Sequence, residues 1–255
     1  QAQPAEPAAH VQLDEAHRLL GQPDERREDA PVDVDDLRRA PHRQVAVGGV
    51  ELGHEDIAFL QYTGGTTGLS KGAVLTHRNV VAAILQAEAW FAPALQRVGD
   101  AHRINSIAAL PLYHIFALTL CLLAIRWGSH LTLIPNPRDI GKFVETLKAR
   151  PFHLLPAVNT LFNALLQHPQ FRSVDFSQLC VSQAGGMAAA EGTARQWQQV
   201  TGCPMVEGWG MSETCAIGTN NPVLSREFSG TIGLPLPGID LAIKDDDGQS
   251  LAVGA

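Results

Sequence analysis

Apolar residues recur along the chain after residue 50 with two different spacings, and each spacing predicts a different kind of element. The first run, Ile57–Tyr62, predicts a short buried strand. Similar short runs bounded by glycine or proline predict strands at residues 106–110, 130–134, 179–182, 205–206 and 241–244. Apolar residues three or four positions apart predict helices over residues 80–91, 118–127, 140–147 and 158–166. Strands that alternate with such helices predict an α/β fold with layered sheets and helices, and with substantially parallel pairing.

Residues 1–49 follow neither spacing. They are rich in Ala, Pro, Asp, Glu and Arg, and the first aromatic residue of the chain is Phe59. Two interpretations stay open. The segment is a solvated, partly disordered lead-in, or it is an out-of-frame translation joined to the coding sequence near Val50. We therefore leave residues 1–49 unassigned and treat residues 50–255 as a separate unit.

Composition and charge narrow the classes of function. Hydrophobic residues make up 45% of the 255 residues and charged residues 18%, which is a normal balance for a globular domain. The formal net charge of −7 argues against general binding to nucleic acid. It does not argue against a small anion, because backbone N–H groups can hold a phosphate without net positive charge.

The cysteines and the apolar stretches predict a cytoplasmic protein without a membrane span. Cys121, Cys180, Cys203 and Cys215 are scattered and form no Cys-x-x-Cys pair, so we expect free thiols. The first residues lack the basic start and the apolar run of a signal peptide. The longest apolar stretch, residues 115–125, is shorter than the ~20 residues that span a bilayer, and we expect it to be a core helix.

The strongest functional signal is the run from Thr63 to Gly72, Thr-Gly-Gly-Thr-Thr-Gly-Leu-Ser-Lys-Gly. Its glycines let successive N–H groups turn into one concavity, a nest for phosphate oxygens, and its hydroxyls and Lys71 add donors and positive charge. A Walker A loop is disfavoured, because Ser70 precedes Lys71 instead of following it. A flexible glycine linker is disfavoured by the position of the run between a buried strand and an amphipathic helix.

Three later segments suit ligand binding, although each has a structural alternative on its residues alone. In Pro111–Phe116, His114 is more often a packed or hydrogen-bonded core residue than a catalyst. In Gln183–Met187, the paired glycines suit a tight turn as well as a flat ring lying on the backbone. In Glu207–Thr214, Glu213 is by itself an ordinary surface acid.

In their order along the chain, these segments resemble the signatures of the adenylate-forming superfamily of acyl-CoA synthetases, peptide-synthetase adenylation domains and beetle luciferases. Residues 158–166 and the flanks of the glycine-rich run resemble the bacterial long-chain fatty acid–CoA ligases in particular. The pattern departs at Ser70, where proline is usual, and at Trp209 and Ser212, where tyrosine and threonine are usual. The last two replacements keep an aromatic face and a hydroxyl.

The resemblance implies roles for individual residues. ATP would be bound by the set Thr63, Gly64, Gly65, Thr66, Thr67, Gly68, Lys71, Gly185, Gly186, Trp209, Gly210 and Ser212. The paired glycines would border the adenine and Trp209 would stack on it. Thr66, Lys71 and Glu213 would be catalytic, with the Glu213 carboxylate on Mg²⁺. His114 would line the acyl pocket and position the substrate.

The implied activity is that of a long-chain fatty acid–CoA ligase, an acid–thiol ligase that uses ATP and coenzyme A with a fatty acid. The alternatives are a fatty acyl-AMP ligase, a peptide-synthetase adenylation domain, or a non-catalytic nucleotide-binding remnant. Residues 50–255 would be a partial AMP-binding domain, part of the large N-terminal domain without the small C-terminal one, so we expect the chain alone to be inactive. Peripheral contact with the inner membrane and a homodimer of the full-length enzyme stay open.

Overall fold

A computed structural model of the chain describes residues 51–63, 71–99, 103–252 and 254. The described part begins with a hairpin of two antiparallel strands, β1 (Ile57–Thr63) and β2 (Lys71–Thr76). The glycine-rich run therefore joins two strands, and the prediction that it joins a strand to a helix is wrong. The prediction of a strand at 57–62 is confirmed, but the strand is not buried, since Leu60 is 56% and Tyr62 66% exposed.

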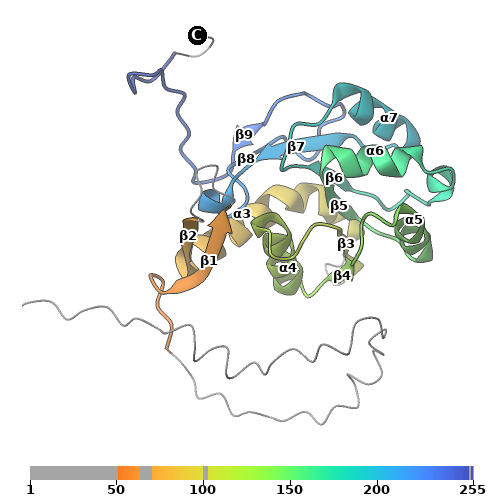
Figure 1. The fold of residues 1–255 in the computed structure, drawn as a ribbon, viewed down its shortest axis with the longest axis horizontal. Helices are drawn as coiled ribbons and strands as arrows, with labels where there is room; N and C mark the ends of the chain where they lie inside the picture. Colours follow the sequence, from red (N-terminus) through yellow and green to blue (C-terminus); the bar gives the residue numbers. More distant parts are fainter. Residues whose placement is uncertain (1–50, 64–70, 100–102, 253, 255) are drawn as a thin grey trace, which may run out of the picture. The chain divides into compact units, whose positions relative to one another are not determined.

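A mixed sheet follows the hairpin and dominates the described part of the chain (Figure 1). Its parallel portion has the order β4-β3-β5-β6-β7, and β8 and β9 extend it antiparallel. The strands are β3 (Asn105–Ala108), β4 (His130–Leu133), β5 (Leu154–Ala157), β6 (Val181–Ala184), β7 (Met205–Trp209), β8 (Thr219–Asn220) and β9 (Leu234–Pro235). Every residue of β3, β5 and β6 is buried, as expected for parallel strands covered on both faces.

Helices cover both faces of this sheet. On one face, α3 and α4 pack against Leu154, Val181 and Val206; on the other, α5, α6 and α7 pack against Leu155 and Met205. The helices are α3 (His77–Leu95), α4 (Ile115–Trp127), α5 (Ile140–Ala149), α6 (Asn159–Gln167) and α7 (Glu191–Thr201). Adjacent residues of one strand point to opposite faces, so Leu154 and Leu155 belong to different cores. The predicted α/β arrangement and its parallel pairing are confirmed.

The helix boundaries follow from local capping chemistry. Thr76 caps α3 and shares a reciprocal capping box with Asn79, which ends β2 and starts the helix without an intervening loop. Asp139 caps α5 by accepting the Lys142 N–H. Gly128 ends α4 in the left-handed conformation, as predicted from the glycine after Trp127.

Several elements escaped the sequence-based prediction. Strand β5 contains Pro156, a residue that argues against a central strand because it has no N–H. The structure accommodates it because β5 pairs with β3 only through Leu154, ahead of the proline, and with β6 along its whole length. Helix α7 buries Ala194, Trp197 and Thr201, a stripe too weakly apolar to be recognised in the sequence. The predicted strand at 241–244 is wrong, since these residues form no strand and Lys244 makes an isolated bridge with Ser250.

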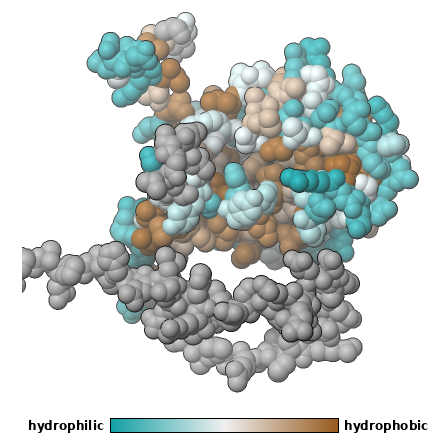
Figure 2. All heavy atoms as spheres, in the orientation of Figure 1, coloured by the Kyte–Doolittle hydropathy of each residue, from teal (hydrophilic) through white to brown (hydrophobic). Residues whose placement is uncertain are grey.

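On the face of the molecule shown in Figure 2, apolar residues gather around the hairpin and along the middle, and polar residues cover the rim. Within the described ranges, none of the helices is both long enough and apolar enough to cross a bilayer.

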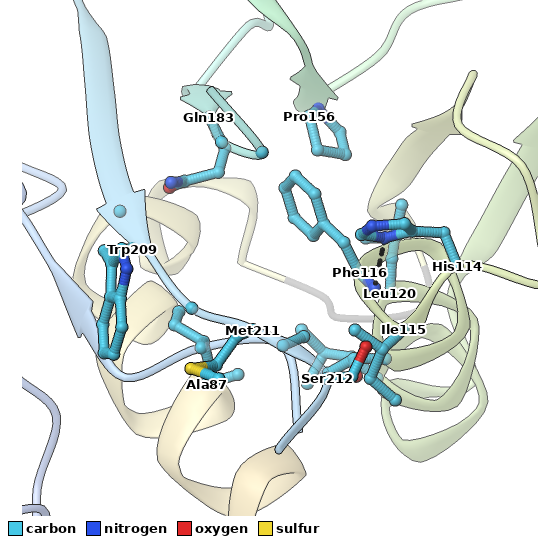
Figure 3. A pocket seen from close by; sticks show the side chains of 18 of the residues that line it. Ala87, His114, Ile115, Phe116, Leu120, Pro156, Gln183, Trp209, Met211 and Ser212 are labelled. Carbon is cyan, nitrogen blue, oxygen red and sulfur yellow. Dashed lines mark hydrogen bonds between the residues drawn. The ribbon is translucent and has the colours of Figure 1, made fainter. Parts of the chain in front are cut away.

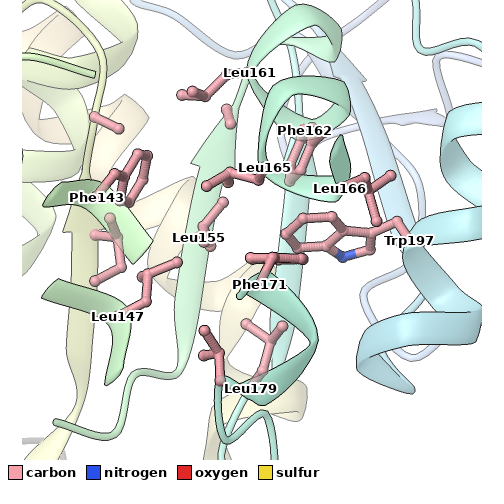
Figure 4. Packing of buried hydrophobic residues seen from close by; sticks show 14 of the residues in the cluster. Phe143, Leu147, Leu155, Leu161, Phe162, Leu165, Leu166, Phe171, Leu179 and Trp197 are labelled. Carbon is pink, nitrogen blue, oxygen red and sulfur yellow. The ribbon is translucent and has the colours of Figure 1, made fainter. Parts of the chain in front are cut away.

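The larger core is centred on Trp197 of α7 (Figure 4). Its ring is fully buried and meets Phe162 edge-on with the ring centroids 4.6 Å apart. Phe171 packs on it with a centroid distance of 5.3 Å. The indole N–H donates to Ser182 Oγ at 2.8 Å, which satisfies the polar end of the side chain within the sheet. Trp197 thus ties α6 and α7 to strand β6.

Replacing Trp197 by alanine should lower the free energy of unfolding by about 3–5 kcal/mol, because the change leaves a cavity and removes the donor to Ser182. Urea unfolding followed by circular dichroism measures the effect. Gln199→Ala, at an exposed position of the same helix, is the control and should change stability by less than about 0.5 kcal/mol. Equal losses in the two variants would contradict the central place of Trp197 in the core.

Candidate functional site

An apolar cavity lies at the carboxyl ends of β5, β6 and β7, beside α3 and α4 (Figure 3). Its inner wall is formed by Phe91, Leu120, Leu123 and Leu154, all of which are buried. From the residues predicted as site residues, the structure brings six to this cavity: His114, Gly185, Gly186, Trp209, Gly210 and Ser212. They come from three separate segments of the chain, which the parallel sheet gathers at one edge.

A second cavity adjoins the first and shares with it Gly186, Gly208, Trp209 and Gly210. Its other lining residues are Met187, Ala188, Ala189, Glu207, Gly230, Thr231 and Ile232. Because three of the four shared residues are glycines, their backbone can lie flat against a ring, and Trp209 adds an aromatic face. The two cavities therefore meet at a wall suited to a planar aromatic ligand.

Trp209 stands at the end of β7 with a defined support behind its ring. A β-carbon at Gly218 would lie 2.9 Å from Trp209 Cζ3, so only glycine leaves room for the indole there. The Gly218 N–H also donates to the Trp209 carbonyl at 2.8 Å. Trp209 is 39% exposed, which leaves part of its surface free for a ligand.

Two polar contacts that the sequence did not reveal hold the floor of the site. Gln183 and Asn220 are buried and bond through their amide groups, at 3.1 Å and 3.0 Å in the two directions. A β-carbon at Gly208 would come within 2.8 Å of the Asn220 Oδ1, so the glycine permits this pairing. Glu207 is also buried and accepts the Ala189 N–H at 2.7 Å, which fixes the segment after the paired glycines.

A strained turn follows Trp209. It contains Ser212, which is predicted to bind phosphate, and Glu213, which is predicted to bind Mg²⁺. It contains the short helix η4 (Ser212–Thr214), after which Cys215 and Ala216 have φ values of 54° and 86°. Such a backbone in non-glycine residues costs about 1–3 kcal/mol each and is common at functional sites. Ser212 lines the apolar cavity, whereas Glu213 is exposed and lines neither of the two cavities.

The turn is held against the hairpin, so the two segments predicted to bind phosphate are neighbours. Helix η4 contacts both β1 and β2, and Cys215 packs with Leu75 of the hairpin and Ile115 of α4. Burial raises the pKa of the Cys215 thiol, which favours the neutral form and a packing role.

Of the glycine-rich run, only Thr63, Lys71 and Gly72 are among the described residues, and they belong to the hairpin. Thr63 and Lys71 are register partners, and Thr63 Oγ1 donates to the Lys71 carbonyl at 3.2 Å. In the described part of the chain, no ion pair joins Lys71 to Glu213. The predicted ligand residues Gly64, Gly65, Thr66, Thr67 and Gly68 lie outside the described residues. Their roles stay predictions.

His114 is exposed and caps α4. The alternative of a packed or hydrogen-bonded core histidine is therefore wrong. Its Nδ1 accepts the Phe116 N–H at 3.2 Å, the contact drawn as a dashed line in Figure 3. The Phe116 ring rests against Gly185, where a β-carbon would lie 3.0 Å from Phe116 Cε1. His114 lies at the rim of the apolar cavity, and its role in positioning a substrate stays a prediction.

A magnesium site is compatible with the donors present, although it would need help from a ligand. Among the described residues, no group of three or more His, Cys, Asp and Glu side chains could hold a metal ion. Mg²⁺ commonly takes one or two carboxylates and completes its octahedron with substrate phosphates and water. The single carboxylate of Glu213, next to the hairpin, fits that mode of binding.

Comparison with known proteins agrees with the fold and shows the family. The model of the AMP-binding enzyme family matches residues 2–255, and the chain belongs to that family. A long-chain fatty acid–CoA ligase of Haemophilus influenzae is 48% identical over 206 residues, 80% of this chain and 36% of the relative. An Escherichia coli O157:H7 protein of the same name is 46% identical over 205 residues. The chain thus spans about a third of the length of these relatives.

Solved structures of adenylate-forming enzymes support the fold. ATP-bound MatB from Rhodopseudomonas palustris superposes with a TM-score of 0.69 at 28% identity, covering 81% of this chain and 39% of that one. The N-terminal domain of FACL13 from Mycobacterium tuberculosis gives a TM-score of 0.70 at 24% identity and supports the fold alone. The predicted fold, part of the large N-terminal domain of an adenylate-forming enzyme, is confirmed. The division near residue 50 stays a prediction.

Replacing Gly210 by alanine should disturb the strained turn, because the new β-carbon would lie 1.8 Å from the Ala216 carbonyl oxygen and the backbone must move. We expect a loss of about 1–3 kcal/mol in the free energy of unfolding, measured by urea titration. Gly192→Ala in α7 is the matched control, since nothing lies within 4 Å of its β-carbon. That variant should be about 0.5–1 kcal/mol more stable. A Gly210→Ala variant as stable as the native chain would contradict the tight packing of the turn.

Proposed function

We propose that this chain forms the part of a long-chain fatty acid–CoA ligase that binds the adenine and the acyl chain. One observation carries the proposal: an apolar cavity and a glycine-rich cavity meet at a shared wall of Gly186, Gly208, Trp209 and Gly210. A fatty acyl chain fits the first cavity and an adenine ring the second. The acyl carboxylate and the α-phosphate would then meet at the junction, which is the geometry that acyl-adenylate formation requires.

The reaction has two steps. The fatty acid carboxylate attacks the α-phosphorus of ATP, the bond to the bridging oxygen breaks, and pyrophosphate leaves. The thiolate of coenzyme A then attacks the acyl carbon and AMP leaves. The named relatives, which are long-chain fatty acid–CoA ligases at 46–48% identity, support this substrate class.

The chain's own residues would bind and orient the reactants. Trp209, supported by Gly218, would stack on the adenine, and Ser212 would donate to a phosphate oxygen. The glycine-rich run between Thr63 and Lys71 would surround the β- and γ-phosphates with backbone donors. Mg²⁺, when held by Glu213 and the phosphates, would neutralise negative charge on the departing pyrophosphate.

The lining of the apolar cavity favours a fatty acid over an amino acid. In the described part of the chain, no Asp or Glu lines this cavity. An amino acid would bring an ammonium group into it, and an unpaired buried charge is costly. A fatty acid brings only methylene groups past its carboxylate, each worth about 0.8 kcal/mol on burial. This comparison disfavours the peptide-synthetase alternative.

The test uses a complete enzyme in which residues 51–255 replace the matching segment of the Haemophilus influenzae relative. ATP–pyrophosphate exchange should depend on a long-chain fatty acid, and a thioester should form when coenzyme A is added. Exchange that depends on an amino acid would favour an adenylation domain. An adenylate that does not pass to coenzyme A would favour a fatty acyl-AMP ligase. ATP binding without pyrophosphate exchange would favour a non-catalytic nucleotide-binding remnant.

In that enzyme, Glu213→Ala and Thr66→Ala should each lower the rate of exchange by about 10²–10³-fold, because each would remove a group that we propose acts on the charge developing in the transition state. Stability should change little for Glu213→Ala, since the side chain is exposed. Glu227→Ala, another exposed acid, is the control and should keep the native rate. Exchange at the native rate in both test variants would defeat the assignment of these residues.

A further inference from the structure

A third cavity opens at the amino ends of β3, β4 and β5, at the edge of the sheet opposite to the candidate site. It shares no lining residue with the two cavities described above. Its lining is polar and basic, and consists of Val98, Arg103, Asn105, His130, Arg150, Pro151, His153, Asp175, Ser177 and Gln178. The proposed ligase activity gives this cavity no task.

The floor of the cavity is a buried histidine held in one tautomer. His153 is 6% exposed, and its Nδ1 accepts the Asn105 N–H at 2.9 Å. The ring proton of the neutral form is therefore on Nε2, which remains a donor. Asn105 is itself fixed, because its side chain donates to the Pro151 carbonyl at 2.9 Å and accepts from Thr132 Oγ1 at 2.8 Å. These hydrogen bonds fix the positions of His153 and Asn105.

Two arginines line the same cavity as His153. Arg150 follows α5, and its Nη1 lies 2.7 Å from His130 Nε2, which must accept the bond because a guanidinium can only donate. Arg103 precedes β3 and makes no ion pair with any described residue. Arg150 uses only part of its five N–H donors on His130. Both Arg150 and Arg103 can therefore donate to a ligand.

Among the described residues that line this cavity, basic side chains outnumber acidic ones. Burial, and then the positive charge of nearby Arg97 in η1 (Gln96–Val98), lower the pKa of His153. The one acid in the lining, Asp175, is fully exposed, and its carboxylate already accepts the Ser177 N–H at 2.9 Å. The described lining therefore favours a ligand with negative charge.

We propose that this cavity is a binding site for a tetrahedral phosphate-type oxyanion, held by Arg103, Arg150 and the Nε2–H of His153. Arg103, Arg150 and His153 come from three separate segments of the chain. Donors from separate segments suit a tetrahedral oxyanion, whereas a planar carboxylate is best served by a single coplanar fork of N–H groups. The site would take a small phosphorylated metabolite by its phosphate group. Its location at the amino ends of the strands makes it independent of the adenine and acyl cavities.

Binding can be tested on the 255-residue chain with inorganic phosphate as the probe, at constant ionic strength maintained with chloride. Imidazole resonances followed by NMR should show a saturable shift at His153 and His130. The pKa of His153 should rise, because the bound anion favours the imidazolium form. Arg150→Gln and Arg103→Gln should each weaken binding by about tenfold or more, as expected for the loss of a charged hydrogen bond.

Arg172→Gln is the matched control, since Arg172 is exposed and lies outside the cavity, and it should bind phosphate like the native chain. Circular dichroism verifies that each variant is folded. The proposal is overturned if phosphate shifts neither imidazole, or if the control loses as much affinity as Arg150→Gln. Acetate that binds as tightly as phosphate would overturn the choice of a tetrahedral oxyanion.

Discussion

The pairing of β6 with β7 is the interaction on which the candidate site depends. In their parallel register, Ala184 lies beside Glu207, so the paired glycines after β6 come next to Gly208 at the end of β7. Parallel strands covered on both faces cannot slip by one residue without turning a whole apolar set to the wrong side. The register therefore places the paired glycines after β6 beside the end of β7, where the two cavities meet. The buried hydrogen bonds between Gln183 and Asn220 join β6 to β8.

The site is made mainly of backbone and of space left by missing side chains. Gly208, Gly210 and Gly218 each occupy a position where a β-carbon would strike a neighbouring atom within 3 Å. The energy stored in the turn at Cys215 and Ala216 is offset by packing of that turn against the hairpin and α4. Loss of any of these contacts would displace the turn that carries Ser212 and Glu213.

The two edges of the parallel sheet have opposite chemical character. At the carboxyl ends, apolar residues and glycines form the adjoining cavities that suit an acyl chain and a planar base. At the amino ends, Arg103, Arg150 and His153 line a polar cavity whose described lining has more basic than acidic side chains. Strand β5 connects the two, since His153 directly precedes it and Pro156 within it lines the apolar cavity. One strand thus supports two sites with different ligands.

The sequence by itself determined the α/β class, most helices, and the motif residues, because apolar spacing, capping residues and glycines act over a few neighbouring positions. It did not reveal β5 or α7, since Pro156 and the weak stripe of Ala194 and Thr201 are compatible with those elements only once the sheet and core surround them. Only the tertiary structure decided that Gly186, Trp209 and His114 line one cavity, that Gln183 meets Asn220, and that basic residues converge at the opposite edge. Those relations join residues distant in the chain, and they follow from the order and register of the strands.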